Sequence, residues 1–247
     1  MTDAHTVDGT AIGAAVLRVE DERLLTGRGA YTDDFNVDGQ VYAAVARATE
    51  AHAEIVSIDL STVRSMPGVL SVLTGADLRA DGLQPLAAQG NPKDVELKNQ
   101  DGSPIFYPGI ELLATDTVRR VGEGIALVVA ESDNAAADAA AHIHASYRTR
   151  RPVVDPVSAL AMDAPRLWRE HGSNICVDDR KGDIEAVEDA FGRAHFIAKL
   201  EVVNNRVTGV PMEPRAAIGL HDPETDLFTL YAGGQGVNRF QRELSTA

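Results

Sequence analysis

The stretch that decides the fold is GIALVVAESDNAAADAAAHIHASY, residues 124–147. Residues 124–130 are apolar throughout, and the run has the length of one buried strand. Residues 131–147 are rich in alanine, the strongest helix former, and either Ser132 or Asp133 can cap the first helical turn. A buried strand that leads directly into a helix predicts a domain in which helices pack against a sheet.

The residues before this stretch show the same alternation of strand and helix signals. The segments VYAAVARA (41–48) and VLSVLTG (69–75) predict strands, and DLSTVRSM (59–66) opens with residues that cap helices. Residues 79–111 follow no helical or strand period and are rich in Gly, Pro, Asn and Gln. They predict a long loop, and long loops in compact domains usually have a function or lie at an interface.

The last hundred residues begin with a segment that breaks regular structure. Residues 150–174 contain prolines and many charges, and we interpret them as a linker between domains. Beyond it, Asp183 can cap a helix that places Ile184, Val187, Phe191 and Ala194 on one face. Residues 196–203 alternate like a half-buried strand, and residues 215–232 predict a β-hairpin that turns at Asp222, Pro223 and Glu224.

A glycine-rich corner follows this hairpin at residues 233–236, between a strand-like run and a predicted helix. Glycine lets backbone N–H groups approach a ligand closely, and Gln235 adds a side-chain donor and acceptor. The start of a helix also favours anionic groups. The alternative is a tight turn with a structural role alone. In the nearby phrase PMEPRAAIG (211–219), the alternative for Glu213 and Arg215 is an ion pair that braces a bend.

Composition excludes several classes of protein. The chain has 37 acidic and 23 basic residues, a net charge of −14, which argues against nucleic acid or an anionic membrane as the main partner. Its single cysteine, Cys176, excludes an internal disulfide, a thiolate zinc site and an iron–sulfur cluster held by this chain. The longest apolar run is too short to cross a bilayer, and the N-terminus lacks the order of a signal peptide, so we expect a cytoplasmic protein.

Several phrases in fixed order carry a resemblance to a known family. They are RVEDERLLTGRGAYTDDF, AHAEIVSIDLS, MPGVLSVLTGADL, VRRVGEGIALVVAES, PMEPRAAIG and YAGGQG. In this order and spacing, the chain resembles the N-terminal portion of the molybdenum-binding large subunit of the xanthine dehydrogenase, aldehyde oxidase and carbon monoxide dehydrogenase family. The resemblance implies an α+β (mixed α/β) fold. It divides the chain into an N-terminal arm (1–25), an α/β hammerhead domain (26–149), a linker (150–174) and a truncated first part of the molybdopterin-binding domain (175–247).

The resemblance also implies a function, oxidative hydroxylation of an aldehyde or an N-heterocycle. The family's cofactor is molybdopterin with molybdenum, in some members as the cytosine dinucleotide, and partner subunits carry 2Fe–2S clusters and FAD. The catalytic glutamate and the pterin-holding loops of the family have no counterpart among these residues, so no catalytic residue is assigned. We expect the chain to be inactive alone and to need a further molybdopterin-binding chain. The alternative is a non-catalytic interaction module or a truncated remnant.

Only the glycine-rich corner allows residues to be carried over from the family. The resemblance implies that Gln235 hydrogen-bonds to an oxygen ligand of the metal and that Gly234 and Gly236 shape the cofactor loop. Glu213 and Arg215 would support this loop from behind without touching the metal.

Overall fold

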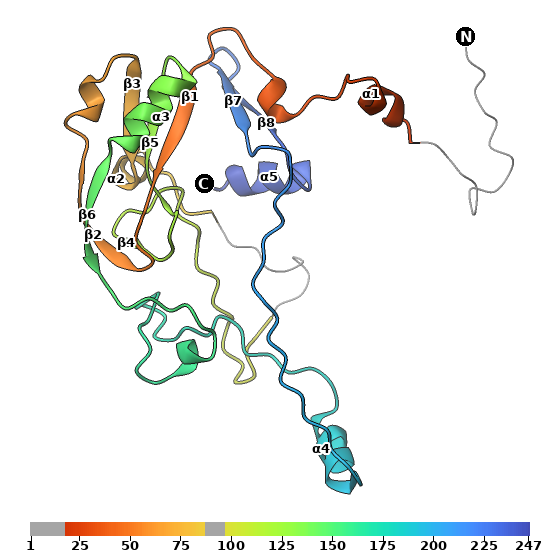
Figure 1. Cartoon of the computed structure of the whole chain (residues 1–247). Coiled ribbons are helices and arrows are strands. Elements are labelled where there is room, and N and C mark those ends of the chain that lie inside the picture. The colour runs from red at the N-terminus through yellow and green to blue at the C-terminus, as the bar shows by residue number, and fades with distance from the viewer. Residues whose placement is uncertain (1–17, 87–96) are drawn as a thin grey trace, which may run out of the picture. The chain divides into compact units, whose positions relative to one another are not determined.

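The computed structural model describes residues 18–86 and 97–247 of the chain (Figure 1). Two compact units can be distinguished. One comprises Met1–Asp38 with Asn205–Gln235, and the larger one comprises Gly39–Asn204 with Gly236–Ala247. Each unit is described by itself below.

The first sheet of the larger unit has strand β5 (Gly124–Ala130) at its centre, between β1 (Tyr42–Arg47) and β3 (Val69–Thr74). Both pairings are antiparallel, and Ala126 is opposite Ala46 on one side and Thr74 on the other. Because β5 has neighbours on both edges, its side chains Ile125, Ala126 and Val128 are buried. The strands predicted from residues 41–48, 69–75 and 124–130 are therefore confirmed.

Helix α3 (Asp133–Ala141) packs on this sheet (Figure 1). Ser132 is the residue that caps it, because its hydroxyl oxygen accepts a hydrogen bond from the backbone N–H of Ala135 at 3.2 Å. Ala136 and Ala139 are fully buried, and their small side chains allow the helix to lie close to the strands. The helix is shorter than the sequence predicts.

The residues expected to end helix α3 instead form strand β6 (His144–Thr149). This strand pairs with β2 (Ala53–Asp59), which also pairs with the short β4 (Thr117–Val118). Residues 145–147 therefore gain backbone partners on β2, which outweighs the local helix preference. His142 is the C-cap of α3 and His144 begins β6, so the prediction that both lie in one helix was wrong.

Two further predictions for the larger unit are changed by the structure. The segment 59–66 forms only the 3-10 turn η2 (Val63–Ser65), and a helix appears later, at α2 (Gly75–Ala80). Beyond α2, the described part of the predicted loop 79–111 contains isolated bridges, Leu86↔Ile110 and Lys98↔Pro104, and no helix or strand. The rest of that loop, residues 87–96, lies outside the described residues.

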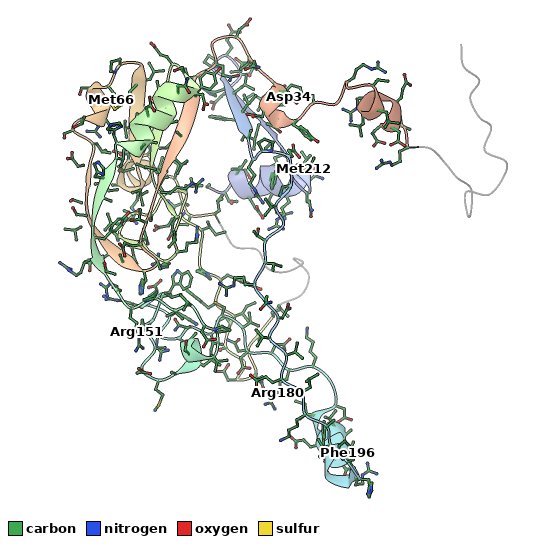
Figure 2. All side chains as sticks on the ribbon, viewed as in Figure 1. Asp34, Met66, Arg151, Arg180, Phe196 and Met212 are labelled. Atoms are coloured by element: carbon green, nitrogen blue, oxygen red, sulfur yellow. The ribbon has the colours of Figure 1, made fainter. Side chains whose placement is uncertain are left out.

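The segment after β6 contains the 3-10 turn η3 (Ser158–Leu160) and then helix α4 (Ile184–Arg193). Asp183 caps α4 as predicted, accepting a hydrogen bond from the N–H of Ala186 at 2.9 Å. The strand predicted at residues 196–203 is wrong. No described residue pairs with this segment, and side chains such as that of Phe196 are exposed (Figure 2). The larger unit also includes α5 (Val237–Leu244).

The smaller unit contains α1 (Asp21–Leu25), the 3-10 turn η1 (Thr32–Asp34) and the hairpin β7 (Ala217–Asp222) and β8 (Leu227–Ala232). The hairpin is confirmed, and Asp226 in its turn has a φ of 54°. The rings of Phe35 and Tyr231 stack with centroids 6.3 Å apart. Helix α1 lies in the predicted N-terminal arm, and Asp21 and Glu22 in its first turn favour it. The rest of the arm, residues 1–17, lies outside the described residues.

No helix in the described part of the chain is long and apolar enough to cross a membrane.

Candidate functional site

The glycine-rich corner begins where the hairpin ends. The last pair of the β7–β8 ladder is Ala217↔Ala232, and α5 begins at Val237. Gly236 lies just before α5 with a φ of 102°, which residues with a side chain rarely adopt. Its carbonyl oxygen accepts the first helical hydrogen bond, from the N–H of Arg239 at 3.1 Å. The backbone at position 236 therefore favours glycine just before α5.

A second glycine of the corner lies against a neighbouring side chain. A Cβ atom placed on Gly233 would lie 3.0 Å from Oε1 of Glu213, which is closer than side chains normally pack. The structure thus brings the PMEPR phrase and the corner together within the smaller unit. Sequence reasoning singled out Gly234 and Gly236 but not Gly233, because the approach of Glu213 depends on the tertiary fold.

The corner presents polar groups that have no partner in the described part of the chain. The backbone N–H groups of residues 233–235 make no hydrogen bond there, and neither does the exposed side-chain amide of Gln235. Free N–H groups beside glycines can donate to the anionic or carbonyl oxygens of a ligand. The amide of Gln235 can donate and accept at once, which would orient a polar group.

The two charged residues of the PMEPR phrase differ in their position. Glu213 is half-buried beside Gly233, whereas Arg215 is exposed and has no ion pair within residues 18–86 and 97–247. Those residues contain no ion pair between Glu213 and Arg215, so the interpretation as a bracing pair gains no support. The carboxylate of Glu213 is the group that lies against the corner.

The described residues offer no protein site for a metal ion. They contain no group of three or more His, Cys, Asp or Glu side chains that could ligate one. Cys176 has a free thiol.

A second polar feature was missed by the sequence analysis. In the larger unit, a pocket of about 400 Å³ is lined by His52, Pro165 and four arginines, which are Arg150, Arg151, Arg166 and Arg169. The runs RTRR and RLWR contain these arginines, but they were interpreted only as charges that interrupt regular structure. The signal available in the sequence was the density of arginine in an otherwise acidic chain.

One carboxylate near this pocket is strongly paired. Nη2 of Arg150 donates to Oε2 of Glu54 at 2.8 Å, and Nη1 of Arg148 donates to the same oxygen at 3.0 Å. The hydrogen bond from Arg150 and the charge of Arg148 hold the pKa of Glu54 below its ordinary value. Glu54 therefore ionises at a lower pH than an unpaired glutamate does.

Comparison with known proteins shows matches over both regions of the chain. Residues 26–151 match the family described as aldehyde oxidase and xanthine dehydrogenase, a/b hammerhead domain, and residues 167–247 match the molybdopterin cofactor-binding domain. The chain therefore belongs to the aldehyde oxidase and xanthine dehydrogenase family.

Individual relatives agree with this assignment. The chain is 36% identical to the nicotine 6-hydroxylase large subunit of Paenarthrobacter nicotinovorans, over 91% of this chain and 26% of that protein. It is 30% identical to the carbon monoxide dehydrogenase large chain of Afipia carboxidovorans, over 89% of this chain and 27% of that one. The crystal structure of quinoline 2-oxidoreductase from Pseudomonas putida 86 superposes with a TM-score of 0.74 and 31% identity, covering 90% of this chain and 27% of that chain.

The chain thus spans about a quarter of the length of each of these three relatives. The matches confirm the α+β fold and the family that the sequence phrases indicate. The roles assigned to Gln235, Gly234, Gly236, Glu213 and Arg215 stay predictions.

Proposed function

We propose that this chain supplies the hammerhead domain and the first part of the molybdopterin-binding domain of an oxidoreductase that hydroxylates an N-heterocycle or an aldehyde. A further polypeptide would complete the cofactor site. The observation that carries this proposal is the corner at residues 233–236. Its free N–H groups and free amide lie in the region that matches the cofactor-binding domain.

The residues of the corner fit a polar, anionic cofactor. The N–H groups of Gly233 and Gly234 would donate to its oxygens, and the Gln235 amide would orient one polar atom. Glu213 would hold the corner in shape, because its carboxylate occupies the space where a side chain at position 233 would lie. Arg215 would support the cofactor loop at residues 233–236 without touching the metal. Molybdopterin, when bound, would supply the redox chemistry of the reaction.

The names of two relatives support an N-heterocycle as one of the two proposed substrate classes. Nicotine and quinoline, which appear in the names of two relatives, both contain a nitrogen heterocycle. An aldehyde is kept as the alternative, because the chain is 33% identical to aldehyde oxidase 1 of Rattus norvegicus.

The same proposal includes partners and location. Subunits carrying 2Fe–2S clusters and FAD would take the electrons, and the cofactor would be molybdopterin, free or as the cytosine dinucleotide. We place the complex in the cytoplasm, without nucleic acid or membrane as a partner, in keeping with the acidic composition.

A second candidate function is a non-catalytic interaction module. It is favoured by the apolar side chains of residues 196–212, which include Leu200 and Met212 with exposed fractions of 87% and 95%. Exposed apolar runs of this kind mark surfaces that associate with other chains. A module would bind a partner and contain no molybdenum.

Purification of the chain from its native cells, with the subunits that accompany it, tests the proposal. We expect a molybdopterin-binding polypeptide to co-purify and molybdenum to be present in stoichiometric amount by elemental mass spectrometry. The complex should reduce a dye with an N-heterocyclic substrate. Gln235→Ala should lower the molybdenum content or the dye-reduction rate about tenfold, as expected for loss of one hydrogen bond to a charged group.

The matched control is Gln241→Ala, which removes an exposed glutamine from α5 and should change neither quantity. A complex without molybdenum would support the interaction module. Stoichiometric cofactor and full activity in the isolated chain would contradict the need for a further polypeptide.

A further inference from the structure

The arginine pocket of the larger unit is built from two parts of the chain that are distant in sequence. His52 immediately precedes β2, and all four arginines lie in the predicted linker, residues 150–174, with Arg150 and Arg151 directly after β6. The N–H at Nδ1 of His52 donates to the backbone oxygen of Arg151 at 3.0 Å, which fixes this wall of the pocket. The pocket volume of about 400 Å³ is within the range of small-molecule sites.

The charges that line the pocket are only partly neutralised by the protein. Arg150 pairs with Glu54 at 2.8 Å, and Arg151 pairs with Asp163 at 3.3 Å. Arg166 and Arg169 have no ion pair or hydrogen bond from their side chains within the described residues. The pocket therefore retains an excess of two positive charges, in a chain whose net charge is −14.

One donor at the pocket is also unsatisfied. Nε of Arg150 is buried and has no hydrogen-bond partner in the structure. A buried donor without a partner is unfavourable, because it has lost its hydrogen bonds to water. This atom is covered by protein, so a bound anion could accept from it only after the Arg150 side chain moves.

From these observations we propose that the pocket binds a phosphate group, either as free phosphate or as the phosphate of a small ester. Guanidinium groups match phosphate oxygens in paired hydrogen bonds, and arginines on several sides suit a tetrahedral anion better than a planar carboxylate. The excess of two positive charges matches a phosphate dianion. A pocket larger than phosphate itself leaves room for the remainder of an ester.

The position of the single tryptophan provides a direct measurement. Trp168 lies between Arg166 and Arg169 in the sequence, and the guanidinium carbon of Arg119 lies 5.3 Å from its ring centroid. Trp168 is half-buried and also contacts Phe106 edge to face at 6.1 Å. Movement of either neighbouring arginine toward a ligand should change its fluorescence.

The test is a titration of the purified chain with inorganic phosphate at constant ionic strength, followed by tryptophan fluorescence. We expect a saturable change that sodium chloride does not reproduce. Arg166→Gln and Arg169→Gln should each raise the dissociation constant about tenfold, because each removes a charged hydrogen-bond donor. Arg166→Lys should have a smaller effect, because it keeps the charge and loses the paired geometry.

Arg180→Gln is the matched control, because it makes the same charge change at an exposed arginine that lies apart from Arg151 in Figure 2. It should leave the dissociation constant unchanged. A parallel titration with adenosine monophosphate separates the two sources, since tighter binding than phosphate indicates an ester and equal or weaker binding indicates free phosphate. No saturable change, equal binding of acetate, or unchanged affinity in both glutamine variants would overturn the proposal.

Discussion

Asp77 is the residue whose ionisation is most directly tied to local structure. Its Oδ2 accepts hydrogen bonds from the hydroxyl of Thr74 at 2.6 Å and from the N–H of Thr74 at 2.7 Å. These bonds, the hydroxyl first, lower the pKa of Asp77 below its ordinary value of 3.8. A carboxyl with a lowered folded-state pKa stabilises the fold at pH values above 3.8, and this contribution is lost as pH falls through the folded-state pKa.

We therefore predict that Asp77→Asn lowers the free energy of unfolding by about 1 kcal/mol at pH 7. The difference from the wild type should shrink as the pH falls from about 5 toward 3, because the wild-type carboxyl becomes protonated. Urea unfolding followed by Trp168 fluorescence at a series of pH values measures this. Asp138→Asn, an exposed carboxyl on α3 without a side-chain bond in the described residues, is the control. A difference that stayed constant with pH would contradict the assigned role.

Individual site residues could be predicted from the sequence only where a polar side chain lies within a phrase that resembles the family. Gln235 and Glu213 stand out because both lie in phrases that resemble the family. Gly233 could not be selected among its neighbours, because the constraint comes from the carboxylate of Glu213. The arginine pocket could not be predicted either, because nothing in the sequence places His52 next to Arg166.

At the scale of elements, substitution by alanine should have opposite effects on stability at two glycines that lie in helices. A Cβ atom on Gly75, the first residue of α2, would lie 2.6 Å from the backbone oxygen of Leu113 and from Oγ1 of Thr115. Gly75→Ala should lower the free energy of unfolding by about 1–3 kcal/mol, as overpacking does. Urea unfolding followed by Trp168 fluorescence measures it.

Gly192 in α4 is the matched control, because a Cβ atom there would meet no atom within 4 Å. Gly192→Ala should stabilise α4 by about 0.5–1 kcal/mol, since alanine loses less backbone freedom on forming a helix. Hydrogen exchange of the α4 amides should slow a few-fold. Equal destabilisation by both substitutions would show that the close contact at Gly75 is not the cause.

Elements were predictable where local pattern and tertiary pairing agree. Residues 124–130 and 183–193 carry a clear strand or helix pattern, and both form the expected element. Residues 144–147 have a helical local preference, but pairing with β2 makes them a strand. Residues 196–203 have the alternation of a strand, but no partner strand is present among the described residues. Both predictions were wrong because strand formation depends on a partner strand distant in sequence, which residues 144–147 have and residues 196–203 lack among the described residues.

For the whole molecule, the ordered phrases predicted the family and the fold, and the domain matches confirm both. The predicted boundaries at residues 25, 149 and 174 stay predictions. The matched ranges 26–151 and 167–247 leave only a short interval between them. The predicted linker, residues 150–174, packs against earlier residues. For example, Nε of Arg119 donates a hydrogen bond to the backbone oxygen of Leu167 at 2.9 Å. Charge and proline content indicate a linker but do not indicate what it packs against.

The last prediction concerns the segment between α4 and β7 in the intact chain. Residues 195–216 make no backbone–backbone hydrogen bonds within the described structure, and nearly all are exposed. Proteases cleave such segments first, because the backbone can enter the active site without unfolding a neighbour. Trypsin should therefore cut after Lys199 or Arg206 well before it cuts after Arg47, which lies in the paired strand β1. Mass spectrometry of a time course identifies the sites.

The double variant Lys199→Gln with Arg206→Gln should delay the first cut within this segment, whereas Arg180→Gln should not. If the proposed function is right, a completing molybdopterin-binding chain should cover the apolar side chains at residues 196–212 and protect Lys199 and Arg206 in the complex. Cleavage after Arg47 at the same rate would contradict the exposure of the segment. Rapid cleavage after Lys199 in the intact complex would instead contradict the expected position of the partner, because a chain that covers this segment would keep the protease away from it.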